Sequence, residues 1–169
     1  MEGNGISSNS SLMFMFVGAL AVLIIIIILR TRWQMNKAAD GNEHIRWGKK
    51  MEGSSKYKEA MDCYLRAERM FGKKNDDDGR ARAWCQAGLL ELKRGFPREA
   101  LVYFRKAEPL AREASSPESY GFILINMGDA EKEAGNRQKA RKYYLEAEAV
   151  YKEDEDEMGL MFVQDKLEE

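Results

Sequence analysis

The side chains that could do chemistry in this 169-residue chain are few, and no catalytic or metal-binding pattern groups them. His44 is the only histidine, and it stands near no cysteine pair and no second histidine at metal-ligand spacing. The glycine-rich phosphate and dinucleotide motifs and the nucleophile elbow do not occur. We therefore predict that the chain is not an enzyme, binds no metal and uses no cofactor.

The acidic run at residues 75–79, Asn-Asp-Asp-Asp-Gly, has the composition of a calcium-binding loop. Its register does not fit, because Lys74 would be the first ligand and Cys85 the last, and neither side chain supplies a carboxylate oxygen. The run is better interpreted as a polar connection whose carboxylates cap the following helix.

The net charge and the cysteine content limit which partners and which compartment we expect. With 27 basic and 28 acidic residues, the net charge is −1, so no overall field attracts nucleic acid, and we predict no nucleic-acid partner. Because no catalytic motif is present, we also expect no small-molecule substrate. The two cysteines, Cys63 and Cys85, form no C-x-x-C pair and are typical of ordinary packing in a reducing compartment.

Residues 12–29 form an uncharged apolar run of eighteen residues. As a helix this run would be about 27 Å long, close to the ~30 Å hydrocarbon core of a bilayer. The preceding residues 1–11 contain no Lys or Arg, unlike a cleavable signal peptide. We therefore predict a retained transmembrane helix over residues 12–32, with residues 1–11 as an extracytoplasmic leader.

Basic and aromatic residues follow the apolar run and predict its orientation. Arg30 and Arg32 favour the cytosolic side, and Trp33 is typical of an interfacial anchor. The expectation is a single-pass membrane protein with its N-terminus outside or lumenal, a juxtamembrane linker at residues 33–40 and the remaining chain in the cytosol.

The rest of the chain repeats itself with a period of forty residues. Gly48, Gly88 and Gly128 align at this spacing without any insertion. Four further columns hold an alanine, an aromatic ring, a second alanine and a glutamate. They are Ala60, Ala100 and Ala140; Tyr64, Phe104 and Tyr144; Ala67, Ala107 and Ala147; and Glu68, Glu108 and Glu148. Such a constant spacing indicates three tandem structural units.

The aligned columns predict a helical hairpin in each unit. Ala60, Tyr64 and Ala67 are four and three residues apart and therefore share one face of a second helix. The aligned glycine lies on the first helix, where it lets the two helices approach closely. Turns are expected around Gly53, Gly95 and Gly135.

These residues resemble the tetratricopeptide repeat family, most closely at Gly88, Ala100, Phe104 and Ala107. The resemblance implies an all-α fold, an α-solenoid of three hairpins over residues 41–169. The expected units are residues 41–78, 79–116 and 117–154, and residues 157–169 read as an amphipathic capping helix. Together with the predicted span, this gives an N-terminal transmembrane helix followed by the solenoid.

In this family the first helices line a concave groove that binds a peptide or a helix of a protein partner. Carried over residue by residue, the resemblance implies a partner groove made of Ile45, Lys49, Arg82, Cys85, Leu89, Leu92, Phe122, Ile125 and Asp129. The expected function is a membrane-anchored adaptor that holds a partner at the cytosolic face. Two alternatives stay open: a permanent subunit of a membrane complex, and an extracytoplasmic chaperone-like protein if the topology is inverted.

Overall fold

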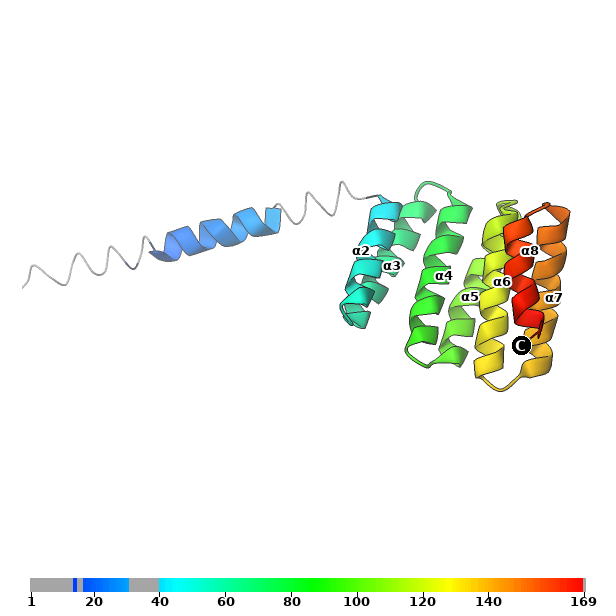
Figure 1. Cartoon of the computed structure of the whole chain (residues 1–169). Coiled ribbons are helices and arrows are strands. Elements are labelled where there is room, and N and C mark those ends of the chain that lie inside the picture. The colour runs from blue at the N-terminus through cyan, green and yellow to red at the C-terminus, as the bar shows by residue number, and fades with distance from the viewer. Residues whose placement is uncertain (1–13, 15–16, 31–39, 169) are drawn as a thin grey trace, which may run out of the picture. The chain divides into compact units, whose positions relative to one another are not determined.

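The computed structural model describes residues 14, 17–30 and 40–168. The chain divides into two compact units, Met1–Ala39 and Asp40–Glu169. Figure 1 shows α2 to α7 of the second unit following one another in chain order, from cyan to orange, with α8 in red beside α6 and α7. They are α2 (Gly41–Gly53), α3 (Tyr57–Gly72), α4 (Asp77–Lys93), α5 (Pro97–Glu113), α6 (Pro117–Glu133), α7 (Arg137–Glu153) and α8 (Glu157–Glu168).

One turn geometry recurs every twenty residues along this unit. After each helix from α2 to α7, one residue adopts a left-handed backbone, and the next N–H donates to a carbonyl five residues earlier. Glycine fills this position only at Gly95 and Gly135, with φ of 79° and 86°. The other four left-handed residues are Ser55, Asn75, Ser115 and Glu155. Identical turns make connections within and between hairpins equivalent, so the helices stack regularly.

Each helix packs against its neighbours in sequence, and the first helices also contact one another in the order α2, α4, α6, α8. Between the two helices of a hairpin, an aromatic ring lies over a glycine. Tyr144 of α7 lies against Gly128 of α6, and Phe104 of α5 lies in the same way against Gly88 of α4. The buried alanines of the second helices complete this close packing. The predicted all-helical solenoid of hairpins is confirmed, whereas the predicted unit bounds stay predictions.

The predicted transmembrane helix is wrong. Within residues 14, 17–30 and 40–168, no helix is both long and apolar enough to cross a bilayer. The prediction of a span over residues 12–32 is thereby overturned, and with it the single-pass membrane localisation. Arg30 is exposed in this stretch, while Arg32, Trp33 and the leader at residues 1–11 lie outside the described residues.

His44 is buried on α2, edge-on to Trp47 with a ring-centroid distance of 5.1 Å. Its Nδ1 has no hydrogen-bond partner among the described residues. Burial, followed by the charge of the nearby Arg66, lowers the pKa of His44 below its ordinary value. The folded domain therefore favours the neutral imidazole.

This burial predicts a pH-dependent stability. We expect the free energy of unfolding to fall as the pH drops below about 6.5, because the unfolded chain then takes up a proton that folded His44 disfavours. Urea denaturation at about pH 7.5 and about pH 5.5 measures the loss, and His44→Leu should reduce it. An equal loss of stability in both proteins would show that other groups titrate instead.

Candidate functional site

A groove runs along the layer formed by α2, α4, α6 and α8. Its volume is about 620 Å³, and Asp156 of the α7–α8 connection is one of its lining residues. Because these helices contact one another in sequence order, residues far apart in the chain meet on one surface. The groove is lined by Asn42, Ile45, Arg46 and Lys49 of α2; Arg82, Cys85 and Gln86 of α4; Glu118, Ser119, Phe122 and Ile123 of α6; Tyr151 of α7; Asp156; and Met158, Gly159, Met161 and Phe162 of α8.

Four large apolar side chains of the groove are exposed, and we call them the apolar lip. Phe122 is 41 % exposed, Met158 79 %, Met161 65 % and Phe162 47 %. On the same helix α8, Val163 is fully buried against α6 and α7, so the lip residues belong to a different face. Several large apolar side chains exposed along one groove are typical of a surface that another molecule covers.

A chain of polar contacts joins three helices beside the lip. Arg82 of α4 donates to Asn42 Oδ1 of α2 at 3.3 Å and pairs with Asp78 Oδ2 at 3.1 Å. Ser119 of α6 donates to the second oxygen of Asp78 at 2.7 Å. These contacts hold the N-terminal ends of α2, α4 and α6 in register and give the Arg82 charge a carboxylate partner within the domain.

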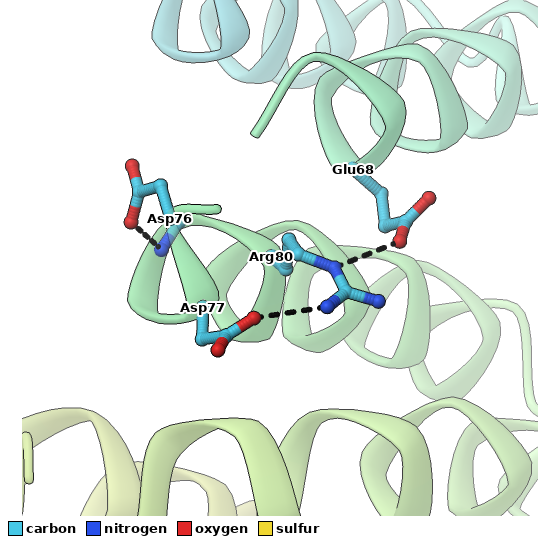
Figure 2. A network of polar contacts seen from close by, with 5 residues as sticks. Glu68, Asp76, Asp77 and Arg80 are labelled. Carbon is cyan, nitrogen blue, oxygen red and sulfur yellow. Dashed lines mark hydrogen bonds and ion pairs between the residues drawn. The ribbon is translucent and has the colours of Figure 1, made fainter. Parts of the chain in front are cut away.

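The acidic run at residues 75–79 stabilises the start of α4. Asp76 accepts a hydrogen bond from the Gly79 N–H at 2.7 Å, and Asp77 pairs with Arg80 at 2.9 Å. Arg80 also reaches Glu68 of α3 at 3.2 Å, as Figure 2 shows. The predicted helix cap is confirmed. Among residues 14, 17–30 and 40–168, no group of three or more His, Cys, Asp or Glu side chains could hold a metal ion.

The α2 side of the groove is basic at its surface and apolar beneath. Lys49 is exposed there and has no ion-pair partner among the described residues. Arg46, by contrast, lies 3.5 Å from the Glu43 carboxylate. Cys85 forms part of the buried floor, and burial raises the pKa of its thiol to about 12, with Lys49 opposing the rise. The Cys85 thiol near Lys49 is therefore neutral at physiological pH.

The structure brings five of the nine predicted groove residues together. These five are Ile45, Lys49, Arg82, Cys85 and Phe122. Leu89 and Leu92 are half-buried instead, against the core cluster that contains Phe104.

The other two predicted residues lie where α8 packs on α6. Ile125 is buried in a cluster with Val163. Asp129 accepts a hydrogen bond from the Tyr144 hydroxyl at 2.8 Å and pairs with Lys166 of α8 at 3.0 Å. Both residues are thus engaged by the domain's own helices rather than presented in the groove.

Sequence reasoning missed the contribution of α8 to the groove. Phe162 stands one period of forty residues after Phe122, and both rings line the same groove. Continuing the repeat alignment into the C-terminal helix would have found it. Because that helix was interpreted only as a cap, Met158 and Met161 were not predicted to line the groove either.

Comparison with known proteins agrees with this architecture. A family model described as tetratricopeptide repeat matches residues 79–153, from the first turn of α4 to the end of α7. No curated protein sequence matches the chain at a significant level.

Several solved structures share the fold. The TPR domain of Arabidopsis FLU is 19 % identical with a TM-score of 0.60, and the match covers 66 % of this chain and 94 % of that one. BtubC from P. vanneervenii is 18 % identical with a TM-score of 0.62, over 69 % of this chain and 48 % of its own. The apo form of RapI is 14 % identical with a TM-score of 0.67, over 92 % and 46 %.

The chain thus spans about half the length of BtubC and of RapI. At these identities the likeness shows the fold and nothing of the ligands. The forty-residue period, the glycine–aromatic hairpins, the matching family model and the shared fold agree. Residues 79–153 therefore belong to the tetratricopeptide repeat family, and the domain has the fold of tetratricopeptide repeat proteins.

Proposed function

We propose that this chain binds a segment of a protein partner, a peptide or a helix, in the groove formed by α2, α4, α6 and α8. The tetratricopeptide fold suggests a protein-interaction scaffold, and members of the family are typically non-catalytic. The proposal accordingly assigns no chemical step to the groove. The observation that carries it is the exposure of the apolar lip.

The energetics of the groove support this proposal. Covering a large apolar side chain contributes about 1.5–3 kcal/mol, and the two rings of Phe122 and Phe162 stand half-exposed. Charged side chains such as Arg46 and Glu118 line the same groove. An apolar centre with a polar rim is the usual layout of a binding surface, in which a few central residues supply most of the affinity.

Site-specific photocrosslinking tests the proposal. A benzophenone amino acid is placed at Met161 in the full chain, which is irradiated in the cells that make it. We expect a discrete crosslinked polypeptide, because this side chain is exposed in the groove. Adding Phe122→Arg should reduce the yield about tenfold, since a charge would replace a central apolar contact.

The matched control carries the benzophenone at Leu145, which is 43 % exposed on α7 and does not line the groove. It should capture no discrete polypeptide. The same bands at both positions, or none at Met161, would contradict groove binding.

A further inference from the structure

We infer that the segment held in the groove carries a side-chain carboxylate, Asp or Glu, that pairs with Lys49 while its apolar side chains cover the lip. This inference rests on the proposed function and specifies the chemistry of the partner. It follows from the distribution of charge around the groove.

The cations that line the groove differ in what they already bind. Arg82 already pairs with the Asp78 carboxylate and donates a hydrogen bond to Asn42. Arg46 lies beside Glu43, although both side chains are largely exposed and the pair is weak. Lys49 alone of these three has no carboxylate within ion-pair distance among the described residues. A partner carboxylate would neutralise it without breaking any contact within the domain.

The negative charges of the groove lie on its other side. Glu118 of α6 and Asp156, which precedes α8, both line it. Asp156 caps α8 by accepting a hydrogen bond from the Gly159 N–H at 3.0 Å, so its charge is held in place. These two carboxylates repel an acidic side chain of the partner. The acidic residue of the partner is therefore confined to the α2 side.

The surroundings of Lys49 strengthen the expected ion pair. Ile45 and the buried Cys85 thiol line the same part of the groove. When the partner displaces water from this wall, the effective dielectric falls and the attraction grows. Across the groove, Met158 and Met161 have flexible, polarisable side chains, which adapt to anchors of different shape. The charge of Lys49 thus selects an acidic partner, and the apolar lip supplies the hydrophobic contact area.

Fluorescence anisotropy with synthetic peptides on the full chain tests this inference. The first probe is a short peptide with leucine and phenylalanine anchors and one glutamate, blocked at both ends so that the side chain is its only carboxylate. A second probe replaces the glutamate with lysine, and a third replaces the anchors with serine. We expect the glutamate probe to bind about tenfold more tightly than the lysine probe, and the serine probe not to bind.

Matched variants identify the residues involved. Lys49→Glu should reverse the preference between the glutamate and lysine probes, whereas Lys142→Glu, exposed on α7 outside the groove, should preserve it. Phe162→Ser should weaken both anchored probes about tenfold. Leu145→Ser, which removes a comparably exposed side chain from α7, should weaken neither.

Three results would overturn the inference: equal binding of the glutamate and lysine probes, an unchanged preference in Lys49→Glu, or no binding of any probe. Crosslinking at Met161 then separates the two proposals. If the benzophenone at Met161 still captures a polypeptide, the groove binds a partner of different chemistry. If it captures none, the proposed groove function is wrong as well.

Discussion

Replacing Val163 with aspartate is expected to release α8 from the domain. Val163 is fully buried in a cluster with Leu124, Ile125 and Tyr151. An unpaired charge buried there would cost about 3 kcal/mol or more, which the chain avoids by detaching its last helix. Hydrogen exchange of the α8 amides should rise about a hundredfold.

The exposed neighbour provides the control for this change. Gln164→Asp adds the same charge to the same helix on its solvent side and should leave exchange in α8 unchanged. Detachment of α8 should also abolish peptide binding, because Met161 and Phe162 leave the groove with it. Normal protection of α8 in Val163→Asp would show that other contacts, such as Lys166 with Asp129, hold the helix.

Gly128→Ala is expected to destabilise the domain by about 2 kcal/mol, a fall in Tm of about 6 °C. A methyl group on Gly128 would overlap the Tyr144 ring at Cε1 and lie 2.9 Å from its Cζ. The ring cannot move aside easily, because it is buried and its hydroxyl donates to Asp129. The overlap outweighs the gain of ~1 kcal/mol that alanine brings to a helix.

Gly53→Ala makes the same exchange at the end of α2, where nothing lies within 4 Å of the added methyl group. Only the helix-propensity gain remains there, so this variant should be as stable as the parent or up to about 1 kcal/mol more stable. Thermal unfolding by circular dichroism compares the two. Equal stability of Gly128→Ala and Gly53→Ala would show that α6 and α7 do not depend on close approach.

The repeat could be predicted because the same residue types recur at the same positions of each unit. A column such as Gly48, Gly88 and Gly128 opposite an aromatic column records one packing contact made three times. The positive-φ turns were only partly predictable. Glycine at positions 95 and 135 predicts a left-handed turn residue, because glycine adopts a positive φ easily. The residue types of Ser55 and Glu155 predict no such turn, and there the stacking of the helices determines the backbone conformation.

The predicted membrane span shows where a local pattern misled. The apolar composition of residues 12–29 suggested a bilayer-length helix, yet no described helix is long and apolar enough to cross one.

The sequence by itself determined that the second unit is a stack of glycine–aromatic hairpins without catalytic motifs, because helix pairing depends on residues close together in the chain. Only the tertiary structure decided which groove residues stay open. α8 covers Ile125 and engages Asp129, and it adds Phe162 beside Phe122. Helical spacing gives the face on which a side chain lies, but what covers that face depends on helices from elsewhere in the chain.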